Sequence, residues 1–222
     1  MLICIIHFHF ITRLVRLLVK GLCLLCKIPD KYQALKKSAE YKDLLNNANE
    51  DNFTEVMRKW FSIWLLGKNK NFSINFFETL RRSGLISYDS IQDYIGHESG
   101  GFYEDFIVTD LVKCRKDTKD IANENIEICG NTYLSKEIDS HNNIELIFSF
   151  STRTWEYLRK TKLKSQDNTL PVSNAHGRLY KLDNSDKYII PLAHFSQTIF
   201  NYYLRNSYFD YLKDGLQSFT SI

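Results

Sequence analysis

The sequence predicts an α/β protein: a three-layer α/β/α fold with a central, mostly parallel sheet of four strands. Two observations carry this prediction. From Trp60 onward, short apolar runs alternate with segments of helical spacing, a pattern typical of a parallel sheet covered on both faces. The chain of 222 residues is also 44% hydrophobic and 25% charged, so it can bury a full core without disulfide bonds.

Four apolar runs are the predicted strands, each short enough to be a buried parallel strand: 60–67, 106–112, 144–150 and 188–192. Helical spacing predicts the segments between and after them: 75–85, 125–140, 151–163 and the tail from Thr198. The first of these helices is expected to stop near Gly84. Ligands of parallel sheets bind beyond the carboxyl ends of the strands. That rule selects four places: 67–72, 109–113, 149–151 and 193–197.

The apolar start of the chain invites a membrane interpretation over residues 1–26. Three basic residues interrupt it, however, before it reaches the roughly 20 apolar residues of a spanning helix; they are Arg13, Arg16 and Lys20. From Ile11 the spacing instead favours an amphipathic helix. We therefore expect no membrane span.

The chain is expected to divide at residue 58, into an N-terminal helical extension (1–58) and an α/β domain (59–222). Residues 1–10 are expected to be a loose part of the extension. The five cysteines are Cys4, Cys23, Cys26, Cys114 and Cys129. Their odd number, without a secretion signal, argues against a disulfide scaffold. The pair at 23 and 26 has metal-ligand spacing, although two cysteines in an apolar helix can equally be small hydrophobic residues.

Five segments, taken in order, resemble the uracil-DNA glycosylase superfamily: IVTDLVKCRK, EICGNTYLSKEI, IELIFSFSTRTWEYL, HGRLY and YIIPLAHFS. That family carries a Thr-Asn/Asp-x-Val-Lys-Cys strand end, a helix with a cysteine, a strand running into Gly-x-x-Ala, and a Pro-x-x-His-Pro-Ser loop. The match covers roughly residues 60–215, with order and spacing kept. The resemblance implies the α/β fold of this superfamily. It also implies a base-excision repair glycosylase that hydrolyses the N-glycosidic bond of uracil, or another deaminated base, flipped out of DNA.

The cysteines resemble those of the iron–sulfur branch of that family. In this branch one cysteine follows the Val-Lys of the second strand and another lies about fifteen residues later, which Cys114 and Cys129 match. Cys23 and Cys26 match its N-terminal Cys-x-x-Cys. The resemblance implies a [4Fe–4S] cluster with a structural role. Zinc is the alternative, because four thiolates can also bind a zinc ion. A chain that has lost its cluster is a further alternative.

The loop after the first strand positions water in this family. By resemblance, Asn69 is the catalytic residue that orients the water, since an amide orients water without being a strong base. Gly67 and Phe72 are the base-binding residues, Phe72 by stacking, and Lys68 is a phosphate contact. The alternative is that this segment is a strand-to-helix turn and that Phe72 belongs to the core.

The loop after the last strand gives the second catalytic candidate, His194, which by resemblance donates a hydrogen bond to uracil O2. Ser196 and Arg178 are the expected phosphate contacts, Arg178 lying in the His-Gly-Arg loop. Asp110 stands where the family has an Asn that reads the base. An ionised Asp can only accept hydrogen bonds, so it suits a base with an exocyclic amine better than uracil, unless burial protonates it.

Two classes of function therefore remain: a glycosylase, and a glycosylase-like module that binds nucleic acid or a partner without catalysis. The second is favoured by four departures from the family pattern, Lys70, Asp110, Ser151 and Phe195. The net charge, 29 − 26 = +3, neither indicates nor excludes DNA, because a DNA-binding face is a local patch. The partner expected is DNA that contains a deaminated base. We expect a monomer, located inside the cell in the cytoplasm or with the nucleoid.

Overall fold

The computed structural model is a mixed α/β structure, described for residues 2–6, 59, 62–63, 65–67, 70–96, 101–109, 111, 123–163, 169–194 and 207–222. Its strands are β1 (Leu2–Ile6), β2 (Phe106–Thr109), β3 (Leu146–Phe150), β4 (Tyr180–Lys181) and β5 (Tyr188–Leu192). Its helices are α4 (Lys70–Arg82), α5 (Ile91–Gly96), α6 (Gly101–Asp105), α7 (Asn123–Cys129), α8 (Ser135–Ser140), α9 (Thr152–Lys162), α10 (Val172–Ala175) and α12 (Tyr208–Thr220). A π-helical turn, Gly130–Leu134, joins α7 to α8. The predicted α/β class is confirmed.

In the described part of the chain the strands form one sheet in the order β2-β1-β3-β5-β4. β1 pairs in parallel with β2 and β3, and β3 pairs in parallel with β5. The short strand β4 pairs antiparallel with β5 at one edge. Three predicted strands correspond to β2, β3 and β5, and the last of them has the predicted bounds.

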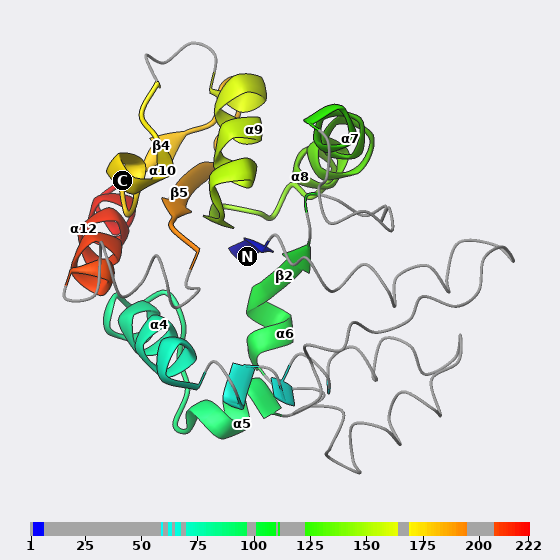
Figure 1. Ribbon diagram of the computed structural model, residues 1–222. Helices are drawn as coiled ribbons and strands as arrows, with labels where there is room; N and C mark the ends of the chain where they lie inside the picture. The colour runs from blue at the N-terminus through cyan, green and yellow to red at the C-terminus, as the bar shows by residue number, and fades with distance from the viewer. Residues whose placement is uncertain are drawn as a thin grey trace, which may run out of the picture.

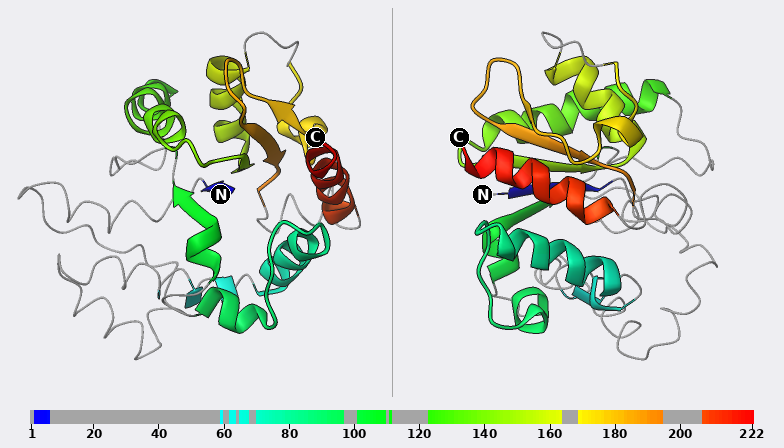
Figure 2. Two further views of the ribbon diagram at one scale, coloured as in Figure 1. Left: turned by 180° about the vertical axis from the view of Figure 1, so that it is seen from behind. Right: turned by 90° about the vertical axis from the view of Figure 1, so that its left-hand side faces the viewer.

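Helices cover both faces of this sheet. Successive side chains of a strand point to opposite faces, so these apolar strands present apolar side chains on both faces. Phe148 of β3 and Ile190 of β5 belong to a core that includes residues of α4, α5, α6 and α12. Their neighbours Ile147 and Ile189 belong to a second core, with residues of α7, α8, α9 and α10. Figures 1 and 2 show α4 and α12 on one side of the sheet and α7, α8 and α9 on the other. All four side chains are fully buried, each contributing about 1.5–3 kcal/mol, which explains why these strands are apolar without alternation.

The predicted first strand, residues 60–67, is wrong. Its described residues 62–63 and 65–66 are helical. The N–H of Gly67 donates to the carbonyl of Ile63 at 2.9 Å, the spacing of a helical hydrogen bond. A continuous apolar run suits a buried helix as well as a strand. Here the hydroxyl of Ser62 donates to a carbonyl of α5, so this segment packs against helices and not into the sheet.

The strand that the prediction lacked is β1, which lies between β2 and β3. Ile5 is paired with Thr109 on one side and with Ser149 on the other. The expected loose extension over residues 1–10, and the division at residue 58, are therefore wrong for residues 2–6. The predicted amphipathic helix from Ile11 lies outside the described residues. None of the helices that the structure describes is both long and apolar enough to cross a bilayer.

The predicted helix stop at Gly84 is confirmed, and its cause is visible in the hydrogen bonds. Gly84 has φ +74°, a left-handed conformation that glycine adopts without steric cost. Its N–H donates to the carbonyl of Arg81 at 3.0 Å, and the N–H of Leu85 donates to that of Leu80 at 3.1 Å. These two bonds satisfy carbonyls that the end of α4 would otherwise leave open, as in a Schellman motif.

Candidate functional site at the carboxyl edge of the sheet

The carboxyl ends of the parallel strands lie in one line across the sheet. Thr109 of β2 lies opposite Ile5 of β1, and Ser149 of β3 lies opposite Ile5 as well. Ser149 also lies opposite Pro191 of β5. Neighbouring strands are about 4.8 Å apart, so this edge is about 14 Å wide from β2 to β5. His194 follows β5 at one end of the line, and the segment that follows β2 leaves from the other end.

Two predicted site residues in these loops, Asp110 and Ser196, lie outside the described residues, as does Phe195, one of the departures from the family pattern. The end of β2 nevertheless carries a polar contact that sequence reasoning missed. The hydroxyl of Thr109 donates to the carboxylate of Glu137 on α8 at 2.7 Å, which holds an acidic side chain at the strand end. The sequence gives no signal for this contact, because Glu137 is one of several charged residues in an amphipathic segment.

Phe72, the predicted stacking residue, lies at the same edge of the sheet. It sits in the first turn of α4 and is half-buried. Its ring centroid is 6.0 Å from that of Phe150, the last residue of β3. It is also 5.8 Å from the rings of both Tyr208 and Phe209 at the start of α12. Phe72 is thus part of the core, and its stacking on a base stays a prediction.

Gly67 does not follow a strand, which was the reason for placing it in the site. It is exposed and follows a helical segment. Lys68 and Asn69 lie outside the described residues. The N–H of Lys70 donates to the carbonyl of Gly67 at 3.2 Å, so Gly67 is close in space to the start of α4. Because Phe72 in that first turn contacts the end of β3, the segment 67–72 leads to the carboxyl edge by way of a helix.

The residue before His194 is held through both of its backbone polar groups. The N–H of Ala193 donates to Nδ1 of His176 at 3.0 Å. The carbonyl of Ala193 accepts from the hydroxyl of Tyr208 at 2.7 Å. Ala193 and Tyr208 are 1% and 0% exposed, so water does not compete for these bonds. His194 itself is half-buried and follows directly.

His176 is neutral, and its tautomer follows from its partners. Nδ1 accepts the Ala193 N–H, so this nitrogen carries no hydrogen. Nε2 lies 3.1 Å from the carbonyl oxygen of Tyr208, which can only accept, so Nε2 is the donor. Burial lowers the pKa of His176 from 6.5 to about 4, outweighing the hydrogen bond to Tyr208, which raises it. His176 is 3% exposed, so its side chain is not available for the phosphate contact predicted for this loop.

Arg178, the predicted phosphate contact in this loop, is exposed and borders a cavity of about 1210 Å³. The cavity extends from Thr152, at the N-terminus of α9, and Ala193 to α12. The hydroxyl of Ser173 and the amide of Asn174 also line it. A cation, a hydroxyl and an amide beside the strand ends form a surface suited to phosphate oxygens.

Close backbone contact fixes this loop against α12. Gly177 has φ +75°, and its N–H donates to the carbonyl of Pro191 at 2.9 Å. A Cβ on Gly177 would collide with the carbonyl of Tyr211, and a Cβ on Gly215 would collide with the carbonyl of Gly177. Glycine at both positions lets the loop and the helix touch, which places His176 under the end of β5.

The predicted cluster ligands are described only in part, since Cys23, Cys26 and Cys114 lie outside the described residues. Cys129, the last residue of α7, is 3% exposed and belongs to the same core as Leu111. Leu111 is three residues before Cys114 in the sequence, and the ligand set itself stays a prediction. Within the described ranges, no group of three or more His, Cys, Asp or Glu residues is arranged to hold a metal ion.

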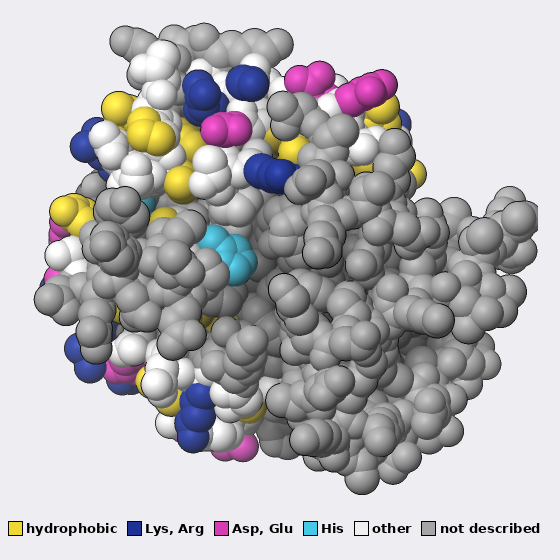
Figure 3. Space-filling model, in the orientation of Figure 1, with side chains coloured by type: hydrophobic (Ala, Val, Ile, Leu, Met, Phe, Trp, Pro, Cys, Tyr) yellow, Lys and Arg dark blue, Asp and Glu magenta, His cyan; other side chains and the backbone are white. Residues whose placement is uncertain are grey.

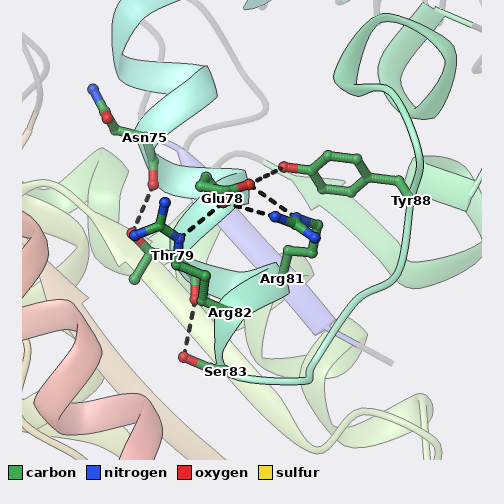
Figure 4. Close-up of polar contacts among 7 residues, drawn as sticks. All are labelled: Asn75, Glu78, Thr79, Arg81, Arg82, Ser83 and Tyr88. Atoms are coloured by element: carbon green, nitrogen blue, oxygen red, sulfur yellow. Dashed lines mark hydrogen bonds and ion pairs between the residues drawn. The ribbon is translucent and has the colours of Figure 1, made fainter.

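Charged side chains on the described surface differ in how firmly they are paired. Figure 3 shows the side of the molecule toward which the strands run, with a histidine exposed near its centre and Lys and Arg side chains above it. On α4, in contrast, Glu78 binds Arg81 at 2.8 Å and Arg82 at 2.8 Å, and the hydroxyl of Tyr88 approaches it (Figure 4). The hydrogen bonds from Arg81 and Arg82 lower the pKa of Glu78 from 4.5 to about 2. These two arginines are engaged within the helix, which makes Arg178 the better candidate for phosphate.

Comparison with known proteins gives no relative: no protein-family model matches the chain, and no curated protein matches it. Function must therefore be argued from the strand-end site itself.

Proposed function

We propose that this chain is a DNA glycosylase that hydrolyses the N-glycosidic bond of uracil, or another deaminated base, flipped out of DNA. The observation that carries the proposal is the shared carboxyl edge, where the segments after β2 and β5 face one another across two strands. These are the segments that hold Asp110 and His194. Their motifs resemble those of the uracil-DNA glycosylase superfamily, and a ligand at this edge is the general rule for open parallel sheets.

The chemistry assigns a task to each end of the edge. When the bond between the sugar C1′ and the base nitrogen breaks, its electron pair leaves with the base. Water then adds its oxygen to C1′, and the proton that it gives up ends on the departed base, which becomes neutral. His194 donates a hydrogen bond to the carbonyl oxygen where the negative charge grows. Asp110 accepts from the far edge of the base. Asn69 orients the water, and Gly67 and Phe72 line the base pocket.

The phosphates on either side of the flipped nucleotide would be held by Ser196, Lys68 and Arg178. The cavity beside Arg178 supports this role, because it reaches Ala193 and is lined by hydroxyl and amide groups. Contacts of this kind supply most of the affinity of DNA-binding proteins and weaken with salt.

The proposal is tested by single-turnover base release from oligonucleotides that contain uracil, hypoxanthine or xanthine. His194→Ala and Asn69→Ala should abolish release. The matched controls are His141→Ala and Asn142→Ala, because both residues are exposed and lie in the turn before β3, at its amino end; these variants should keep the wild-type rate. Failure of the wild type to release any of these bases would refute the proposal, and an active His194→Ala variant would refute the site.

A glycosylase-like module without catalysis is the second candidate, favoured by the departures from the family pattern. One of these departures, Ser151, has a structural role as the N-cap of α9. Its hydroxyl oxygen accepts the N–H of Thr154 at 3.0 Å and so caps α9, where the family usually has glycine. DNA binding that falls steeply with salt, without release of any deaminated base, would support this candidate.

A [4Fe–4S] cluster held by Cys23, Cys26, Cys114 and Cys129 is part of the proposal. It would tie the N-terminal segment to the sheet and takes no part in the steps above. The burial of Cys129 beside the segment that leads to Cys114 supports it. Visible absorption and about four irons per chain in anaerobically purified protein are expected. Colourless protein with full zinc occupancy would refute the iron–sulfur cluster and show that the four cysteines bind zinc.

A further inference from the structure

Two buried side chains, His176 and Tyr208, connect Ala193 at the end of β5 to the start of α12. His194 is the next residue after Ala193. His176 accepts from the N–H of Ala193 and donates to the carbonyl of Tyr208. Tyr208 returns a hydrogen bond from its hydroxyl to the carbonyl of Ala193. The rings of His176 and Tyr208 are 4.2 Å apart at their centroids. We call these two side chains, together with Ala193, the clasp.

The clasp reaches His194 through the peptide bond that joins it to Ala193. The peptide unit is planar, so the atom that fixes its carbonyl also fixes the direction of the next N–H and Cα. The Tyr208 hydroxyl holds that carbonyl at 2.7 Å. His176 holds the preceding N–H at 3.0 Å, which fixes the other side of the Ala193 Cα. The N–H and the carbonyl of Ala193 are both fixed by hydrogen bonds, and this fixes the position of the His194 Cα.

The clasp is built for position and not for contact with a ligand. Tyr208 and Ala193 are 0% and 1% exposed, and His176 is 3% exposed. The neutral imidazole uses both nitrogens on backbone groups, and the Tyr208 hydroxyl uses its hydrogen on another. None of these groups is left to take part in chemistry. A buried network with every member satisfied is rigid, which is what a catalytic side chain at a strand end requires.

We propose that His176 and Tyr208 are positioning residues, which set the His194 side chain in place for hydrogen bonding to the departing base. The positioning of His194 is inferred from the hydrogen bonds of the clasp. The expected effect on base release rests on the proposed glycosylase function. A displacement of about 1 Å at a reacting group can reduce a rate on the order of 100-fold. Loss of the clasp should therefore lower the rate of base release more than the affinity for DNA.

The variants separate the hydrogen bonds of the clasp. Tyr208→Phe removes the bond to the Ala193 carbonyl and keeps the ring. His176→Asn keeps an acceptor near the Nδ1 position, and His176→Gln keeps a donor near the Nε2 position. Tyr133→Phe is the matched control, because Tyr133 is 42% exposed and lies in the π-helical turn, outside the clasp and the cavity beside Arg178.

The experiment has two readouts on the full chain. In single-turnover release of uracil, Tyr208→Phe and His176→Gln should be about 10- to 100-fold slower than wild type, with the Kd for DNA changed less than threefold. His176→Asn should be less impaired than His176→Gln, and Tyr133→Phe should keep the wild-type rate. In ¹⁵N-histidine NMR, the His194 ring signals should shift in Tyr208→Phe and stay in place in Tyr133→Phe.

The two readouts keep this inference apart from the proposed function. If the wild type releases no base, the glycosylase proposal falls, while the NMR comparison still decides whether the clasp sets His194. Folded Tyr208→Phe and His176→Gln proteins with wild-type rates and unshifted His194 signals would overturn the inference. A slower rate with equally weakened DNA binding would overturn it too, because the clasp would then shape the DNA surface and not the histidine.

Discussion

Acidification should destabilise the folded chain through His176. Burial lowers the pKa of this imidazole from 6.5 to about 4. Between these values the unfolded chain binds the proton and the folded chain does not, so stability rises with pH. The stabilisation is complete above about pH 6.5 and is lost as the pH falls toward 4. The difference of 6.5 − 4 units, at about 1.36 kcal/mol per unit, gives about 3 kcal/mol in total.

Most of this loss falls in a range that is easy to measure. Between about pH 7.5 and pH 5 the same two pKa values give a loss of about 2 kcal/mol. The physical reason is that a protonated imidazole cannot accept the N–H of Ala193, and a buried charge without a partner is costly. Urea unfolding followed by tryptophan fluorescence gives the free energy of unfolding at each pH.

His176→Gln removes the titrating group, so its free energy of unfolding should fall by about 2 kcal/mol less than that of the wild type between these pH values. The other histidines contribute to both proteins and cancel in this comparison. His141→Gln is the control, because His141 is exposed and should leave the wild-type pH dependence unchanged. Parallel curves for wild type and His176→Gln would refute the reasoning, since His176 would then bind its proton equally in both states.

Three further predictions concern stability at other places. Gly215→Ala should cost about 1–3 kcal/mol, measured by urea unfolding, because its Cβ would meet the Gly177 carbonyl; an unchanged midpoint would mean that α12 can move away. Glu78→Gln should cost about 0.3–1 kcal/mol at neutral pH and nothing near pH 2, since the lowered pKa of Glu78 gives stability only above its titration; a cost that persists in acid would contradict the ion pairs. Ser151→Ala should cost about 1 kcal/mol through the lost cap and Ser151→Gly only a few tenths, so equal midpoints for both would contradict the capping role.

The sequence predicted those parts of the fold whose pattern has one structural meaning. The runs that became β3 and β5 are bounded by polar residues and too short for helices, and both are strands. The run 60–67 has the same composition, but it packs against α5 and is helical. Residues 2–6 were missed for the opposite reason, because the apolar residues that follow hide where the strand ends. In both cases tertiary contacts decide between helix and strand.

The clasp could not be predicted, because its members are far apart in sequence and chemically ordinary. His176 and Tyr208 are separated by 32 residues. Tyrosine in an amphipathic helix is usually a core residue, which Tyr208 also is. His176 was noticed only as part of a loop that resembles a phosphate-binding one. Its burial shows that, in this loop, the arginine faces solvent while the histidine serves the backbone of β5.

The start of α4 lies at the carboxyl edge, although the described residues before it, 62–63 and 65–66, are helical and not part of a strand. α4 runs back along the sheet, so that Phe72 contacts Phe150 at the end of β3 and Phe76 contacts Phe148 two residues earlier. Phe72, in the first turn of α4, is therefore at the carboxyl edge. In the sequence, Asn69 therefore lies between two helical segments and does not follow a strand. In the proposed glycosylase, His194 follows β5, whereas Asn69 directly precedes α4 in the sequence. Substitutions under the first turn of α4 should then reduce the activity that depends on Asn69 before they affect the activity that depends on His194.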